Sequence, residues 1–107
     1  WSGISLEYAF TFERPPIFID VPKKILNNNS DKIFLEPIEN SIRHEVGHVI
    51  LPTNIKEIPN IIESLKNHEY TEKIKEIRSK TVYNIGKSSK IGAEYIQQLI
   101  KELRTQN

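Results

Sequence analysis

Residues 1–22, WSGISLEYAFTFERPPIFIDVP, decide the expected fold, because they predict a helix followed at once by an apolar strand. Ser2 and Gly3 suit the start of the helix, since serine can cap it and glycine lets another group approach the backbone closely. The prolines at 15–16 end the helix, because proline lacks the N–H that a helical hydrogen bond requires. Residues 17–21 then form a short apolar run of the kind that is buried in parallel sheets.

The start of this helix is the predicted binding site. A helix N-terminus can hold a phosphate on its N–H groups, because those groups have no partner within the helix. Glu7 lies about one turn further on, where its carboxylate can accept hydrogen bonds from sugar hydroxyls. We therefore predict that Ser2, Gly3 and Glu7 bind a substrate that carries both phosphate and hydroxyl groups.

The composition limits the class of protein. The 107 residues suffice for one compact domain, and 15 basic against 14 acidic residues give a net charge of +1. This balance shows no bias toward nucleic acid or an anionic membrane. The chain has no cysteine, which excludes disulfides and thiolate metal sites, and no apolar run approaches the roughly 20 residues that cross a bilayer. We expect a cytoplasmic protein that does not bind nucleic acid.

The chain also has no methionine, and it opens at what looks like the middle of a strand–loop–helix unit. We therefore expect it to be the C-terminal piece of a longer protein, with the missing N-terminal domain as its partner.

The remaining residues predict short apolar elements separated by polar loops. Residues 22–32 are polar and rich in turn formers, and 33–35 (IFL) predict a short strand or an apolar plug. Ile42 and Val46 should form the inward face of a short helix that Gly47 ends. A strand at 48–51 should follow, and then three amphipathic helices at about 57–67, 71–80 and 91–103. This order fits the end of an open α/β domain.

The pentapeptide HEVGH, from His44 to His48, matches the zinc-peptidase signature H-E-x-x-H. In that site two histidines on one helical face bind zinc, and the glutamate between them acts as general base. Gly47 and the apolar run after it instead place His48 at or beyond the end of a helix. We favour a helix-to-strand turn and keep a small zinc metallopeptidase using His44, Glu45 and His48 as an alternative. Three downstream carboxylates could supply a third ligand: Glu57, Glu63 and Glu69.

The sequence Gly86-Lys87-Ser88 matches the end of a phosphate-binding P-loop. Thr81 stands where the first glycine of that motif must be, so the segment predicts the start of the last helix instead.

Three segments of the opening resemble the CDP-glycerol glycerophosphotransferase family of wall teichoic acid and capsule enzymes: WSGISLEYAF, Arg14-Pro15 and IFID at 17–20. In that family a Ser-Asp-aromatic-Ser-Ser turn opens a helix that carries an acid and then an alanine. A strand preceded by proline follows. Trp1 matches the aromatic residue, Ser2 the first of the two serines and Glu7 the acid. Gly3 stands where the family usually has its second serine, which leaves the backbone N–H in place. Residues 47–54 and 86–89 are similar, more weakly, to later steps of the same fold.

The resemblance implies a two-domain GT-B enzyme whose C-terminal half holds a nucleotide diphosphate at helix N-termini. Ser2 and Gly3 would then face the pyrophosphate, and Glu7 the ribose or nearby hydroxyls. The family's catalytic histidines lie on segments that are missing here, so no catalytic residue is assigned. No metal or other cofactor is implied.

We therefore predict that residues 1–107 are part of a Rossmann-like α/β nucleotide-diphosphate-binding domain, with short parallel strands and a helical C-terminal end. The whole transferase would move glycerol phosphate or a sugar from CDP-glycerol or a nucleotide sugar in cell-wall or capsule polymer synthesis. The fragment alone should be inactive, and a peripheral position of the full-length protein at the inner face of the membrane stays open. The non-enzymatic alternative is an interaction module whose three C-terminal helices dock a partner.

Overall fold

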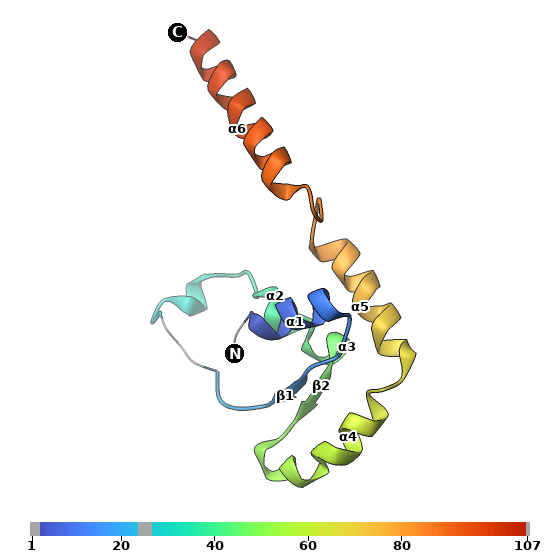
Figure 1. Ribbon diagram of the computed structural model, residues 1–107. Helices are drawn as coiled ribbons and strands as arrows, with labels where there is room; N and C mark the ends of the chain where they lie inside the picture. Colours follow the sequence, from blue (N-terminus) through green and yellow to red (C-terminus); the bar gives the residue numbers. More distant parts are fainter. Residues whose placement is uncertain (1–2, 24–26, 107) are drawn as a thin grey trace.

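The computed structural model describes residues 3–23 and 27–106 (Figure 1). Within these residues the fold is mixed α/β and mostly helical. The elements follow one another in the order α1 (Ile4–Phe12), β1 (Ile17–Ile19), the 3₁₀ turn η1 (Ser30–Lys32), α2 (Ile38–Ser41), α3 (Arg43–Val46), β2 (His48–Ile50), the 3₁₀ segment η2 (Pro52–Glu57), α4 (Ile58–Ser64), α5 (His68–Thr81) and α6 (Ser88–Thr105).

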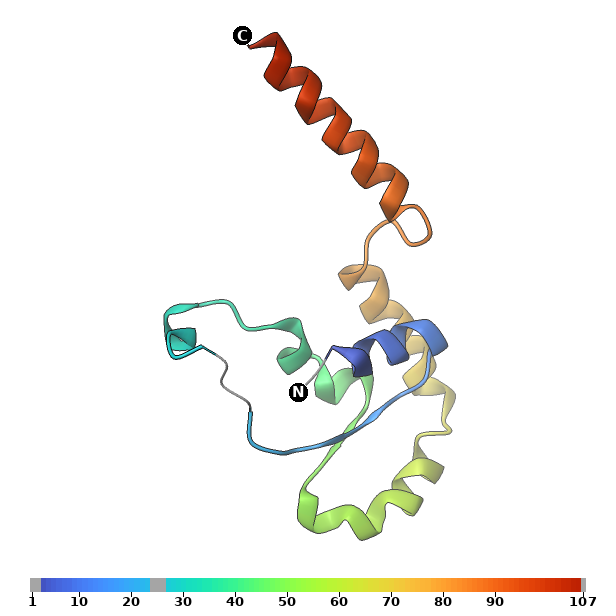
Figure 2. The same cartoon turned by 60° about the vertical axis from the view of Figure 1, so that its left-hand side comes forward.

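The two strands pair in parallel, with Ile17 opposite His48 and Ile19 opposite Ile50 (Figures 1 and 2). Both were predicted, and both are shorter than the apolar runs that predicted them. The Asp20 N–H still donates to the Ile50 carbonyl at 2.7 Å, but the Val21 N–H turns back to the carbonyl of Ile19. The sheet therefore ends at Val21, whose N–H bonds within its own segment and no longer to β2.

A small core joins α1, α3 and α5. Five buried residues form it, and Phe10, Phe18 and Ile77 pack against them; the five are Leu6, Ala9, Ile42, Val46 and Ile74. The inward face predicted for Ile42 and Val46 is confirmed, and Ile74 is the buried residue of α5. Two other apolar residues of α1, Ile4 and Phe12, are exposed. Only one side of α1 meets α5, so no layer within the described residues covers its outer apolar side chains.

Glycine is required at position 47 because no side chain fits there, and not because of its backbone dihedral angles. Its φ of −161° is ordinary extended backbone, but a Cβ at this position would overlap the carbonyl oxygen of Pro16. That carbonyl accepts a hydrogen bond from the His48 N–H at 3.1 Å. The missing side chain thus lets α3 end and β2 begin directly against the chain that enters β1.

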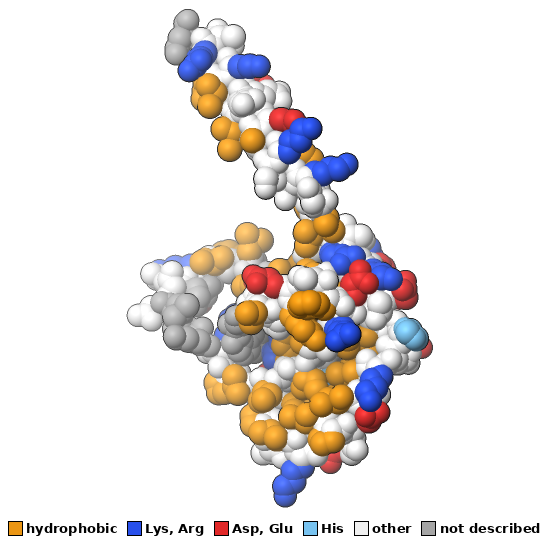
Figure 3. Space-filling model, viewed as in Figure 1, with side chains coloured by type: hydrophobic (Ala, Val, Ile, Leu, Met, Phe, Trp, Pro, Cys, Tyr) orange, Lys and Arg blue, Asp and Glu red, His pale blue; other side chains and the backbone are white. Residues whose placement is uncertain are grey.

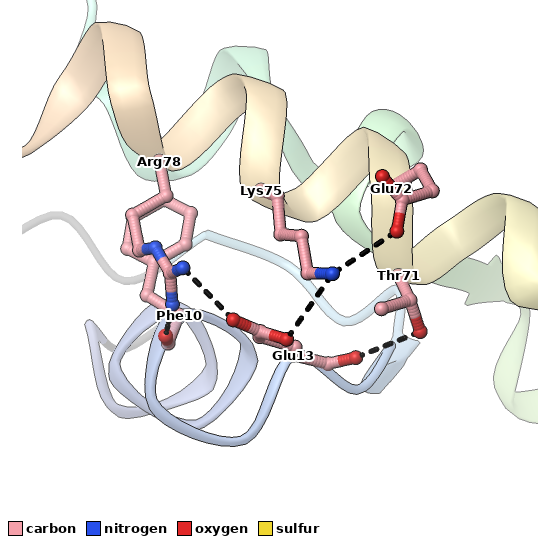
Figure 4. A network of polar contacts seen from close by, with 6 residues as sticks. All are labelled: Phe10, Glu13, Thr71, Glu72, Lys75 and Arg78. Carbon is pink, nitrogen blue, oxygen red and sulfur yellow. Dashed lines mark hydrogen bonds and ion pairs between the residues drawn. The ribbon is translucent and has the colours of Figure 1, made fainter.

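A polar network attaches the C-terminus of α1 to α5 (Figure 4). Glu13 adopts the left-handed conformation, with φ 54°, and its carbonyl accepts from the Thr71 hydroxyl at 3.1 Å. Arg78 donates to the Phe10 carbonyl at 2.6 Å and to the Glu13 carboxylate at 2.9 Å, and Lys75 lies 3.8 Å from that carboxylate. Carbonyls at a helix end have no partner within the helix, so these contacts satisfy them and fix α1 on α5.

The last helix, α6, extends away from the body of the molecule (Figures 1 and 2). The radius of gyration is 18.9 Å, against about 13 Å for a compact domain of this size. Asn84 and Gly86 both have positive φ in the segment before α6, and no residue of α6 is buried. The predicted helix is confirmed, but its apolar stripe is exposed: Ile91, Tyr95, Leu99, Ile100 and Leu103.

Apolar side chains are also exposed on the body. Figure 3 shows them gathered over the region of the strands and α4, and again along α6. The segment 33–35 is neither strand nor plug, since its three apolar side chains face solvent and Phe34 is 97% exposed. Within the described residues no strand or apolar layer lies against residues 33–35, so their side chains stay exposed.

Candidate functional site

Two of the three predicted site residues lie together at the start of α1, and Ser2 lies outside the described residues. Gly3 is the N-cap, half-buried, and its carbonyl accepts from the N–H groups of Leu6 and Glu7 at 3.0 and 3.1 Å. The side chain of Glu7 is exposed in the first turn. A helix end and an accessible carboxylate are thus present within one turn of each other.

Helix α1 and strand β1 run in roughly opposite senses (Figures 1 and 2). Residues 13–16 connect the end of α1 to the beginning of β1, so the start of α1 points toward the end of that strand. In α/β folds with parallel strands, ligands bind at the carboxyl ends of the strands. The position of Gly3 agrees with this rule.

Glu39, in the first turn of α2, is a neighbour of Gly3 that sequence reasoning missed. Its Oε1 would lie 3.7 Å from a Cβ built on Gly3, which is ordinary contact, so packing does not require glycine here. A carboxylate beside a helix N-terminus is stabilised by the positive end of the helix dipole. Glu39 would therefore compete with a phosphate for the same place.

Arg43 is a second feature that the sequence did not single out. It is the one charged side chain that is buried in the described part of the chain, with 7% of its surface exposed. Its Nη1 lies 3.3 Å from the Asp20 carboxylate, just after β1, and its guanidinium carbon lies 5.3 Å from the centre of the Phe18 ring. The one sign of this ion pair in the sequence is Asp20, an acidic residue directly after an apolar strand. The Asp20 carboxylate offsets the buried positive charge of this arginine, so the pair fixes α3 against the end of β1.

The two histidines of HEVGH do not share a helical face. His44 lies in α3, which ends at Val46, and His48 is the first residue of β2. A hollow of about 240 Å³ brings Glu69 beside His44 and Glu45 but does not include His48. Over residues 3–23 and 27–106, no group of three or more His, Asp or Glu side chains is arranged to hold a metal ion. The geometry that a zinc peptidase needs is therefore missing from this segment.

Comparison with protein-family models, with curated proteins and with solved structures finds no match. Within the described ranges no helix combines the length and the apolar character needed to cross a membrane. The described residues thus define a small, mostly helical α/β unit with two short parallel strands.

Proposed function

We propose that these residues form part of the donor-binding half of a transferase that moves glycerol phosphate or a sugar from a nucleotide diphosphate. The observation that supports the proposal is the α1 N-terminus, with Gly3 as its cap and the exposed carboxylate of Glu7 within the first turn. The N-terminal domain of the same longer protein would supply the acceptor site and the catalytic residues.

In this proposal the positive end of α1 stabilises the diphosphate that leaves during transfer. The helix has nine residues, enough for its peptide dipoles to add up, and the Gly3 N–H can approach a phosphate closely. Fixed dipoles directed at developing negative charge lower the barrier without reorganising during the reaction.

Two carboxylates near this helix end should have opposite effects on a bound donor. Glu7 is exposed and would accept hydrogen bonds from ribose or glycerol hydroxyls. Glu39 lies against Gly3, so its charge would repel the diphosphate. Since the two residues have the same chemical type, exchanging each for glutamine provides a matched comparison.

The test is calorimetric titration of CDP-glycerol, CDP and UDP-glucose into the full-length protein that contains these residues. We expect Glu7→Gln to weaken donor binding about tenfold, the cost of hydrogen bonds to a charged acceptor. Glu39→Gln should tighten it about two- to fivefold, because it removes a competitor at the helix end. Glu102→Gln, on the distant α6, serves as the control and should leave the affinity unchanged.

If none of the nucleotides binds, or if Glu7→Gln and Glu102→Gln bind the donor equally well, the transferase proposal is wrong. The non-enzymatic interaction module would then be the better interpretation of this chain.

A further inference from the structure

A larger hollow lies at the other end of α1, between that helix, the start of β1, α4 and the start of α5. Its volume is about 530 Å³, which falls in the range of about 300–1,000 Å³ that is usual for small-molecule sites. It is separate from the Gly3 end of α1, because its lining begins at Tyr8 and continues through the turn that leads into β1.

Three side chains around this hollow are basic, and none of its described lining residues is acidic. Lys66 pairs with Glu63 at 2.7 Å just past the C-terminal end of α4. Arg14 and His68 form no ion pair with any residue in the described part of the chain. The exposed guanidinium of Arg14 is therefore a positive charge on the hollow that no carboxylate of the described residues pairs with.

Apolar side chains form the rest of the wall. Ile17 and Leu65 are half-buried, Ile62 is exposed, and the ring of Tyr8 lies at the edge, where it also contacts Phe12. A simple inorganic anion would satisfy the basic groups but would leave this apolar surface in water. A ligand that covers both needs a charged group and an apolar body.

We propose that this hollow binds an organic anion, with a phosphate or carboxylate group attached to an aromatic or aliphatic body. The guanidinium of Arg14 can bind either oxyanion through two parallel hydrogen bonds, and His68 also lines the hollow. The body of the ligand would lie over Ile17 and Leu65. This inference does not rest on the transferase proposal, since it uses the opposite end of α1 and none of the same residues.

Four probes separate the contribution of the anionic group from that of the apolar body. They are phenyl phosphate, benzoate, benzyl alcohol and inorganic phosphate, each titrated into the full-length protein. We expect phenyl phosphate or benzoate to bind at least about tenfold more tightly than the neutral alcohol and the inorganic anion, because only these two have both parts. Whichever of the two binds more tightly identifies the anionic group.

Arg14→Gln should weaken the binding of phenyl phosphate and benzoate by about fivefold or more, since it removes the charged guanidinium and its paired hydrogen bonds. Arg104→Gln removes a comparable exposed arginine from α6 and should change nothing. Ile62→Ser should weaken the phenyl phosphate and benzoate complexes without affecting inorganic phosphate. Circular dichroism and thermal unfolding of each variant establish that it is folded.

Equal binding of inorganic phosphate and phenyl phosphate would overturn the proposal, as would equal effects of Arg14→Gln and Arg104→Gln. Arg14→Gln should leave CDP-glycerol binding intact. The two proposals can therefore fail separately.

Discussion

Helix α6 has a longer apolar stripe than α5, yet only α5 is packed. In α5, Ile74 is completely buried between α1 and α3, and Arg78 bonds to the end of α1. In α6, apolar residues recur at every fourth position, and none of them is buried. An apolar stripe thus identifies the face of a helix that can be covered, but not whether another segment covers it.

The segments before the two helices explain the difference. Asn67 caps α5 through a hydrogen bond from the Glu69 N–H at 3.2 Å, at a turn that brings the helix back across α1 and α3. Before α6, the left-handed conformations of Asn84 and Gly86 direct the chain away from the body. A few backbone angles in a linker therefore decide whether an 18-residue helix meets a core.

The sharpest test of this comparison is the loss of one isoleucine side chain from each helix. Ile74→Ala removes a completely buried side chain and should lower the free energy of unfolding by about 2–4 kcal/mol, the usual cost of a cavity in a core. Ile96→Ala, on α6, removes a side chain that is 58% exposed and should change it by about 0.5 kcal/mol or less. Urea unfolding followed by circular dichroism measures both.

Similar losses from the two isoleucine variants would contradict the comparison. They would mean that α6 is packed against something in solution.

Replacing each of two glycines with alanine should change the stability by smaller amounts, and the two changes should have opposite signs. Gly47→Ala should destabilise the protein by about 1–3 kcal/mol, because its Cβ would overlap the Pro16 carbonyl and force the strands apart. Gly92→Ala, in α6, meets nothing within 4 Å and should stabilise that helix by about 0.5–1 kcal/mol. A lower midpoint of thermal unfolding should reveal the destabilisation by Gly47→Ala. A stronger helical circular dichroism signal should reveal the stabilisation of α6 by Gly92→Ala. Stabilisation by Gly47→Ala would show that β2 does not approach β1 as described.

The smallest expected effect is electrostatic and lies on the exposed face of α5. Lys80 bonds to the Glu76 carboxylate at 2.7 Å, and this hydrogen bond lowers the pKa of Glu76 below its ordinary value of 4.5. Because the folded state favours the charged carboxylate, the contribution is present above the unfolded pKa and is lost as the pH falls through the lower folded pKa.

NMR titration of the Glu76 carboxyl carbon measures this effect. Lys80→Met should return the pKa of Glu76 toward 4.5, whereas Lys73→Met should move it less, because Lys73 acts only through a weaker charge interaction. An equal response to both substitutions would show that the hydrogen bond is absent in solution.

Much of the local structure could be predicted from residue types. The prolines before β1, the glycine after α3 and the four-residue spacing of Ile42 and Val46 each act on their own neighbourhood, and the structure confirms what they predict. The candidate site was predictable only in part. Gly3 and Glu7 lie within one turn of each other because both belong to α1.

The neighbours of that site could not be predicted, because they come from other elements. Glu39 reaches Gly3 only through the course of the chain between β1 and α2, and Arg43 meets Asp20 across 23 positions of sequence. The exposure of residues 33–35 was unpredictable for the same reason. Their apolar character shows what they could bury, and burial needs a surface that the described chain does not provide.

The amino-acid sequence by itself determined which segments form the main helices and both strands, because capping, proline geometry and side-chain periodicity act over a few residues. The tertiary structure alone decided which apolar faces are covered, that His44 and His48 lie apart and that a carboxylate lies beside Gly3. These properties depend on distances between segments far apart in the chain, and a local pattern has no information about such distances.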